Sequence, residues 1–300
     1  MAVLRTPDDA FANLPGYPFA PRYVTIDDHE LGALRVHAVD EGEGPTVLLL
    51  HGEPSWSYLY RKMIPPLVEA GFRCVAPDLV GFGRSDKPQD RSVFSYKRHL
   101  YWLVSTLDAL DLEPVHLFCQ DWGGLLGLRL VGEQPHRFAS VCAANTVLPT
   151  GTMGANEAFI QWRDFSQTVD PFPTGRIISG GCARPVDDAV QAAYDAPYPD
   201  ETYKAAARAF PTLVPITEDM PGAADNRAAW QALTRFERPF LTLFGDSDPI
   251  MAGADQLFQK KVPGCAGQPH AIIPKAAHFI QEDAGEELTQ HLIPWLNAIV

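Results

Sequence analysis

Short apolar runs alternate with longer amphipathic segments over most of the chain. Runs rich in β-branched and aromatic residues predict strands, whereas apolar positions with a helical repeat predict helices. We expect strands at 23–26, 33–38, 46–50, 73–77, 139–144, 239–244 and 271–273, and one that begins at 115. We expect helices at 57–70, 95–112 and 253–260, another ending near 133, and a last one from about 285. This alternation indicates an α/β protein with a mostly parallel central sheet flanked by helices.

The alternation stops at about residue 145 and resumes near 236. The intervening segment is rich in Pro, Ala and Gly, and we expect short helices at 155–167, 186–194 and 201–209. We therefore predict a main domain formed by 1–145 and 236–300, with 146–235 inserted as a helical cap. Open α/β sheets bind ligands at the carboxyl ends of their strands, so a cap there closes a site away from water.

The tightest junction is Gln120-Asp121-Trp122-Gly123-Gly124, where the strand that begins at 115 passes directly into a helix. A sharp strand-to-helix turn needs residues without a Cβ atom, and two glycines follow at once. The α/β-hydrolase fold holds its nucleophile on such an elbow. The pattern thus predicts an α/β-hydrolase fold with Asp121 as the candidate nucleophile.

A carboxylate and a histidine follow in the order that this fold requires. Asp246 and Asp248 lie just after the strand at 239–244, and His278 lies after the strand at 271–273. Nucleophile, acid and histidine is the order of an α/β-hydrolase triad. Of nine histidines, only His278 combines this order with a loop after a strand. Asp246 competes with Asp248, because a carboxylate after a strand is often a turn former.

An aspartate at the elbow implies a different reaction from that of a serine. A carboxylate is already charged at pH 7 and displaces a leaving group from a saturated carbon, which forms an alkyl ester. His278, paired with an acid, would then activate water against that ester. The backbone N–H groups of Glu53 and Trp122 are expected to form the oxyanion hole. This scheme needs no metal ion and no organic cofactor.

Trp122, next to Asp121, indicates the nature of the leaving group. An indole N–H is a donor without an acceptor, and the edge of an aromatic ring is electropositive. Trp122 therefore suits a large, weakly hydrated anion such as a halide, and Trp162 is the best candidate for a second donor from the cap. Trp162 has the alternative of an ordinary core residue of the cap, and we expect Trp102, Trp230 and Trp295 to be packing residues.

These residues resemble those of the haloalkane dehalogenases, over essentially the whole chain. The similarity is carried by His51-Gly52-Glu53-Pro54-Ser55-Trp56, by Gly81-Phe82-Gly83-Arg84-Ser85-Asp86-Lys87-Pro88 and by the elbow. The resemblance implies Asp121 as nucleophile, His278 as base, Asp248 as acid, and Trp122 with Trp162 as halide ligands. It also implies that Glu53 helps to hold the hydrolytic water. The substrate cavity would be lined by Leu125, Phe159, Phe210, Pro211 and Val214.

Other activities on this fold fit these residues less well, and the main alternative is an epoxide hydrolase. An epoxide hydrolase also uses an aspartate, with an aromatic residue where Glu53 stands and two cap tyrosines; Tyr194, Tyr198 and Tyr203 lie in the cap segment. A fluoroacetate dehalogenase would place arginines just after the nucleophile, and 123–128 contains none. An ester hydrolase would have Ser or Cys at position 121. A non-enzymatic receptor on this fold would typically have lost a triad member.

Composition narrows the possible partners. A net charge of −13 argues against nucleic acid or an anionic membrane as a partner. We see no secretory signal at the N-terminus and no apolar run long enough to span a bilayer. Five scattered cysteines lack disulfide or metal spacing and are expected to be buried thiols. We expect a soluble, cytoplasmic protein, monomeric or a small homo-oligomer, acting on a small haloalkane and water.

Overall fold

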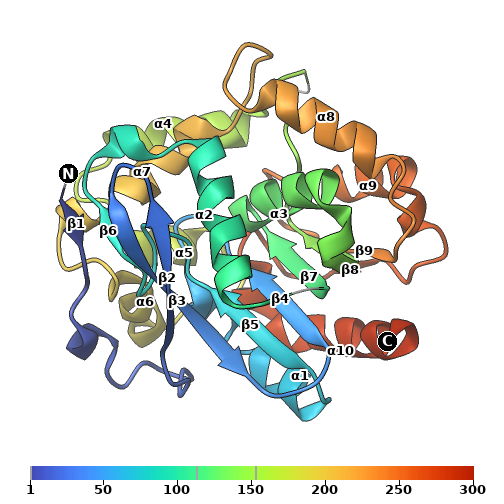
Figure 1. The fold of residues 1–300 in the computed structure, drawn as a ribbon, viewed down its shortest axis with the longest axis horizontal. Coiled ribbons are helices and arrows are strands. Elements are labelled where there is room, and N and C mark those ends of the chain that lie inside the picture. Colours follow the sequence, from blue (N-terminus) through green and yellow to red (C-terminus); the bar gives the residue numbers. More distant parts are fainter. Residues whose placement is uncertain (1, 113, 153) are drawn as a thin grey trace.

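The computed structural model describes residues 2–112, 114–152 and 154–300. Its centre is an eight-stranded sheet with the order β10-β9-β8-β7-β4-β5-β3-β2, and Figure 1 labels the strands from β9 to β2. Neighbouring strands from β10 to β5 are parallel, whereas β3 is antiparallel to both β5 and β2. The strands are β2 (Arg22–Asp28), β3 (Gly32–Glu41), β4 (Thr46–Leu50), β5 (Arg73–Pro77), β7 (Val115–Gln120), β8 (Phe138–Ala144), β9 (Phe240–Gly245) and β10 (Ala271–Ile273). This arrangement confirms the predicted α/β-hydrolase architecture.

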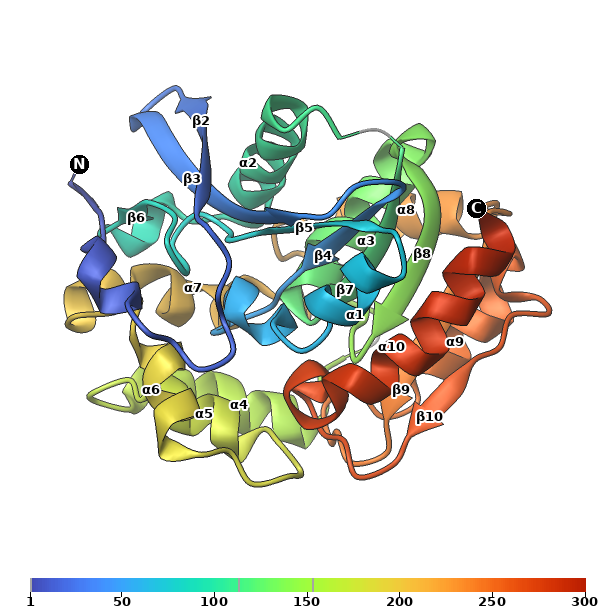
Figure 2. The same cartoon turned by 90° about the horizontal axis from the view of Figure 1, so that it is seen from below.

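Helices cover both faces of the sheet (Figure 2). One face carries α2 (Tyr96–Ala109), α3 (Trp122–Glu133), α8 (Ala223–Leu233) and α9 (Ala254–Lys261), and the other carries α1 (Ile64–Glu69) and α10 (Ile280–Ile299). Successive strand residues point to opposite faces. In β4, Leu48 and Leu50 accordingly enter the first core, whereas Val47 and Leu49 enter the second. A strand buried on both faces must be apolar at every position, which explains its unbroken run of aliphatic residues.

Short elements complete the main domain. Two-residue strands β1 (Val3–Leu4) and β6 (Lys87–Pro88) pair antiparallel to each other. Single 3₁₀ turns occupy Asp8–Phe11, Ser57–Tyr60, Arg91–Val93, Pro135–Arg137 and Pro263–Cys265. The predicted helix at 57–70 is thus divided into a 3₁₀ turn and α1, because Pro65 and Pro66 have no N–H to donate and favour the first positions of a new helix.

The cap consists of α4 (Glu157–Thr168), α5 (Thr174–Gly180), α6 (Asp188–Asp195), a 3₁₀ turn (Glu201–Tyr203) and α7 (Ala205–Leu213). Of these helices, α4, α5 and α6 lie together at the lower left of Figure 2. The expected boundary at 235 requires a correction, because α8 packs on α3 of the main domain. Asn226 on α8 accepts a hydrogen bond from Arg129 on α3 at 3.0 Å. The cap therefore ends before α8.

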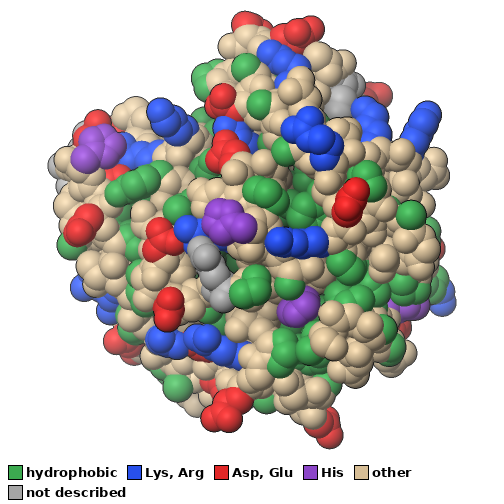
Figure 3. Space-filling view, turned by 45° about the vertical axis from the view of Figure 1, so that its right-hand side comes forward, with side chains coloured by type: hydrophobic (Ala, Val, Ile, Leu, Met, Phe, Trp, Pro, Cys, Tyr) green, Lys and Arg blue, Asp and Glu red, His purple; other side chains and the backbone are tan. Residues whose placement is uncertain are grey.

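Charged side chains of both signs are interspersed on the face seen in Figure 3, without a continuous basic field. Within the described ranges, no helix has both the length and the apolar character that crossing a bilayer requires. All five cysteines are unpaired thiols. Four of them are buried as expected, but Cys182 is only half-buried.

Candidate active site

Asp121 is the single residue between β7 and α3, and its backbone adopts the elbow conformation, with φ of +48° and ψ of −126°. A positive φ is strained for a residue with a Cβ atom, at a cost of about 1–3 kcal/mol, and persists only where surrounding contacts enforce it. Here the Asp121 N–H donates to the Asn145 carbonyl at 3.2 Å. The Asp121 carbonyl accepts from the Thr146 hydroxyl at 2.8 Å. The loop after β8 thus fixes the elbow.

Two glycines allow the backbone to approach this elbow closely. A Cβ atom added to Gly52 would lie 2.3 Å from the Asp121 Cβ, and one added to Gly123 would lie 2.0 Å from the Leu50 carbonyl oxygen. Both distances are far below van der Waals contact. Glycine at these positions brings the end of β4 against the elbow and therefore the Glu53 backbone toward the Asp121 carboxylate.

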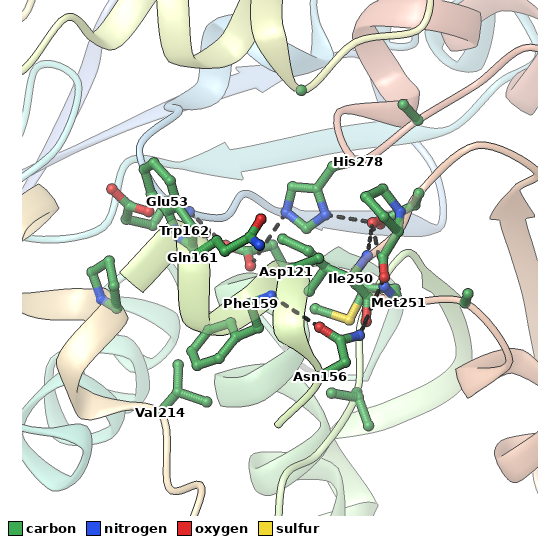
Figure 4. A pocket seen from close by; sticks show the side chains of 18 of the residues that line it. Glu53, Asp121, Asn156, Phe159, Gln161, Trp162, Val214, Ile250, Met251 and His278 are labelled. Atoms are coloured by element: carbon green, nitrogen blue, oxygen red, sulfur yellow. Dashed lines mark hydrogen bonds and ion pairs between the residues drawn. The ribbon is translucent and has the colours of Figure 1, made fainter. Parts of the chain in front are cut away.

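The Asp121 carboxylate faces His278 (Figure 4), and the other side of the His278 ring is hydrogen-bonded to Asp248. The His278 Nε2 atom is 3.5 Å from Asp121 Oδ2, and its Nδ1 atom is 2.8 Å from Asp248 Oδ2. The other Asp248 oxygen accepts the backbone N–H groups of Ile250 and Met251, at 2.9 and 3.2 Å. The structure therefore brings together three side chains from distant parts of the sequence, in a nucleophile–histidine–acid arrangement.

Asp246, the competing carboxylate, lies outside this arrangement. It is exposed and accepts a hydrogen bond from the neighbouring Ser247 hydroxyl at 2.6 Å. Asp248 is buried and bonded to His278. The geometry thus distinguishes two carboxylates that the sequence presents as near equivalents.

Polar side chains that sequence reasoning treated briefly or missed hold the catalytic loops together. Asn145 donates to the Ala277 carbonyl at 2.6 Å and accepts from the Gly245 N–H at 2.8 Å, which ties the loops after β9 and β10 to each other. Gln120 donates to the His278 carbonyl at 3.0 Å. Asp283 accepts the Ala277 N–H at 2.8 Å. The sequence offered one signal for Gln120, because it is a polar residue at the end of a buried, mainly apolar strand.

The two carboxylates determine the charge of His278. Burial alone lowers the pKa of an imidazole, but the charges of Asp248 and Asp121 outweigh it and raise the pKa of His278 to about 10. Burial opposes ionisation of Asp248, yet the facing imidazolium and two backbone N–H groups hold its pKa below the ordinary value. The two neighbouring carboxylates therefore favour the imidazolium form of His278.

Glu53 contributes both a backbone donor and a buried acid. Its N–H donates to Asp121 Oδ1 at 2.7 Å, as expected for one half of an oxyanion hole. In the described part of the chain, no hydrogen bond joins the Trp122 N–H to the Asp121 carboxylate. The Glu53 side chain is 4% exposed, and its Oε1 atom is buried without a partner among the described residues. Burial, reinforced by the charge of Asp121, raises the pKa of Glu53 well above its usual range.

The site opens into a cavity of about 1140 Å³ between the main domain and the cap. Asp121, Trp122, Asp248 and His278 line it from the main domain, and Phe159, Trp162, Pro211 and Val214 line it from α4, α7 and the residue after α7. Leu125 lines it as expected, and so does the half-buried Cys182. Phe210 does not line it, which corrects our expectation. Its ring is fully buried and packs 4.5 Å from the Trp122 ring, so that it supports the indole from behind.

Trp122 and Trp162 differ from the other four tryptophans in their hydrogen bonding. The indole N–H groups of Trp56, Trp102, Trp230 and Trp295 each donate to an acceptor in the protein, at 3.3, 2.9, 2.7 and 2.7 Å. Among the described residues, Trp122 and Trp162 have no such acceptor, and both line the cavity. Two unused donors thus belong to the same cavity as the Asp121 carboxylate.

The lining also bears on the epoxide hydrolase alternative. No tyrosine is among the described residues that line the cavity. Tyr194 donates its hydroxyl to Glu282 at 2.6 Å, and Tyr198 is buried outside the cavity. The pair of tyrosine donors that an epoxide oxygen requires is therefore missing from this lining. Within the described chain, no group of three His, Cys, Asp or Glu residues has the arrangement to hold a metal ion.

Fold and site together define an α/β hydrolase with an aspartate at the nucleophile elbow, and a family model described as "alpha/beta hydrolase fold" matches residues 45–175. A haloalkane dehalogenase of Psychrobacter cryohalolentis is 54% identical over 299 residues, which cover 99% of each chain. One of Mycolicibacterium paratuberculosis is 51% identical, with 100% of both chains covered. The solved structure of the tetrameric haloalkane dehalogenase DpaA from Paraglaciecola agarilytica NO2 is 36% identical, with a TM-score of 0.90 and coverage of 97% of this chain and 98% of that one. The chain belongs to the haloalkane dehalogenase family.

Proposed function

We propose that this dehalogenase hydrolyses the carbon–halogen bond of haloalkanes through a covalent ester on Asp121. The products are a primary alcohol, a halide ion and a proton. His278 acts as general base, Asp248 as its acid partner, and Trp122 with Trp162 as the halide ligands. The observation that carries this proposal is the pair of unused indole donors in the cavity of the Asp121 carboxylate.

In the first step, a carboxylate oxygen of Asp121 attacks the halogenated carbon, and the carbon–halogen bond breaks as the new carbon–oxygen bond forms. The departing halide gains a full negative charge in a largely apolar cavity, where it needs donors. The Trp122 and Trp162 indoles supply them without a competing internal acceptor. Phe210 behind Trp122 holds that ring in place, so the donor is oriented before the charge develops.

In the second step, water attacks the carbonyl carbon of the ester. Forming the ester removes the negative charge of Asp121, and with it one of the two charges that keep His278 protonated. The pKa of His278 accordingly falls during the reaction, so that the ring becomes available as a base for water. Asp248 stabilises the imidazolium that results. The Glu53 N–H, bonded to Asp121 Oδ1 in the resting enzyme, stabilises the oxyanion of the tetrahedral intermediate.

The Glu53 side chain supports the same step. Burial beside Asp121 raises the pKa of the Glu53 carboxyl group and so favours its neutral form, which offers both a donor and an acceptor. We propose that it orients the hydrolytic water between His278 and the ester carbonyl.

Halide release from 1-bromobutane and 1,2-dibromoethane by the purified protein tests the proposal. Asp121→Asn should abolish release, because an amide is a poor nucleophile, whereas Asp246→Asn should leave it unchanged. Release by Asp121→Asn at the wild-type rate would refute the mechanism. Equal turnover of 1,2-epoxybutane and 1-bromobutane by the wild-type protein would favour the epoxide hydrolase alternative.

We propose a cytoplasmic enzyme that acts without nucleic acid or membrane partners, in keeping with its net charge of −13. For its assembly we propose a monomer or a small homo-oligomer. Light scattering on the purified protein decides between these states.

A further inference from the structure

One lining residue of the cavity has no place in the proposed reaction. Arg176 lies on α5, in the cap layer seen in Figure 2. Of the described residues that line the cavity, it is the only lysine or arginine. Its side chain is exposed, whereas Trp122, the residue after Asp121, is buried. Arg176 is therefore a cation at the rim, where the cavity meets solvent.

Arg176 also differs from the other basic residues of the cap. Those residues each lie within salt-bridge distance of an acid, with nitrogen–oxygen distances from 2.6 to 3.7 Å: Arg163 with Asp164, Arg184 with Glu287, and Lys204 and Arg208 with Glu201. Arg176 has no carboxylate or carbonyl partner among the described residues. Its guanidinium fork is thus free to bind a group from outside the chain.

We propose that Arg176 binds the carboxylate of ω-halogenated alkanoates, whose halogenated carbon lies against Asp121. This inference rests on the proposed function and names a substrate class for the same site. Arginine presents two parallel N–H donors that match a carboxylate. Apolar lining residues such as Ile177 and Leu257 suit the methylene chain between the two ends of the substrate.

The charges at the two ends of the cavity decide which chain length of ω-halogenated alkanoate Arg176 helps to bind. Asp121 and Asp248 repel a second carboxylate at the buried end, so a short haloacid such as bromoacetate is disfavoured. A longer chain leaves its carboxylate at the rim, where water and Arg176 both solvate it. In the proposed reaction, 6-bromohexanoate and water give 6-hydroxyhexanoate, bromide and a proton.

The test compares 6-bromohexanoate with the neutral 1-bromohexane in the wild-type protein and in Arg176→Gln. An exposed ion pair changes binding by only about two- to fivefold. We expect Arg176→Gln to raise KM for 6-bromohexanoate by that factor with kcat unchanged, and to leave 1-bromohexane unaffected. Arg176→Lys should retain part of the preference. Added salt should reduce the preference in the wild-type protein, because it screens exposed charges.

Arg163→Gln is the matched control, since Arg163 is a cap arginine that does not line the cavity. It should leave both KM values unchanged. Equal KM values for 6-bromohexanoate in the wild-type protein and Arg176→Gln, with normal turnover of 1-bromohexane, would overturn this inference alone. Absence of turnover of 1-bromohexane by the wild-type protein would instead refute the proposed function.

Discussion

The Nδ1 atom of His278 lies 2.8 Å from Oδ2 of Asp248, although 30 positions separate the two residues in the chain. This hydrogen bond fixes the ring so that Nε2 points toward Asp121. Asp248 is held in turn by two backbone N–H groups, so neither partner of the pair is free to rotate. The orientation of His278, the proposed base, is therefore set by the loops after β9 and β10.

Asp248→Asn should lower kcat by about a thousandfold or more, because asparagine stabilises the wrong ring tautomer and cannot balance an imidazolium. The first step does not use the base, so a burst of halide close to one equivalent of enzyme should remain. Rapid-quench halide assays measure both quantities. Asp246→Asn is the control, and a comparable loss of kcat in that variant would contradict the assignment of the acid.

The charge of Asp121 should be visible in the titration of His278. The charges of Asp248 and Asp121 raise the pKa of His278 to about 10, so removing one charge in Asp121→Asn should lower it by about one unit or more. Nitrogen-15 NMR of the histidine side chains measures this pKa in both proteins. An unchanged His278 pKa in the variant would show that Asp121 does not control the base.

The raised pKa of His278 also makes the stability of the protein depend on pH. A pKa raised in the folded state from 6.5 to about 10 contributes stability that is complete below pH 6.5 and is lost as the pH rises through 10. The Tm of the wild-type protein should therefore fall between pH 7 and 10 more steeply than that of Asp121→Asn. Calorimetry at several pH values checks the difference in slope, and parallel curves for the two proteins would contradict it.

The unused N–H donors of Trp122 and Trp162 predict that halide binding quenches tryptophan fluorescence. In the double variant Trp122→Phe/Trp162→Phe, quenching of tryptophan fluorescence by bromide should disappear, because both unused N–H donors are gone. We expect kcat for 1-bromobutane to fall by about a hundredfold or more, as charge-stabilising donors are worth about 2.7–4 kcal/mol each. Trp230→Phe removes a tryptophan whose N–H is bonded to Leu148. It should retain halide quenching, and quenching that survives in the double variant would disprove the halide site.

Gly123 lies so close to the Leu50 carbonyl that adding one methyl group at this position should destabilise the fold. In Gly123→Ala the new Cβ would overlap the Leu50 carbonyl, which cannot move without disturbing β4. We expect a loss of about 2 kcal/mol or more in the free energy of unfolding, measured by urea denaturation. Gly180→Ala is the control, since its Cβ would meet nothing within 4 Å. A cost in Gly123→Ala no larger than in Gly180→Ala would contradict this packing.

Local sequence signals were enough to predict the sheet. The bounds of β4, β5 and β10 match the expected strands because each is a short, mainly apolar run with clear turn residues beside it. The positions of α5 and α8 were not predicted. α5 is a short helix rich in Gly and Ile, and α8 is stabilised by packing on α3 that no local pattern reveals.

The site was predictable where its residues follow strands, as Asp121, Asp248 and His278 do. Phe210 was misplaced because an aromatic residue in the cap can face the cavity or the core, and only packing against Trp122 decides. The unused N–H of Trp162 and the unpaired state of Arg176 are likewise properties of the folded molecule. They depend on which acceptors lie nearby, which the order of residues alone does not contain.

The covalent ester on Asp121 is the central claim, and mass spectrometry of a His278 variant tests it most directly. His278→Gln retains a side chain able to bond Asp248 but removes the base, so the first step should proceed and the second should stop. After incubation with 1-bromobutane, the peptide that contains Asp121 should gain the mass of a butyl group less one hydrogen, because butyl replaces the carboxyl proton, and the double variant Asp121→Asn/His278→Gln should gain none. A folded His278→Gln protein that releases halide without this adduct, or that carries it on another residue, would contradict the account.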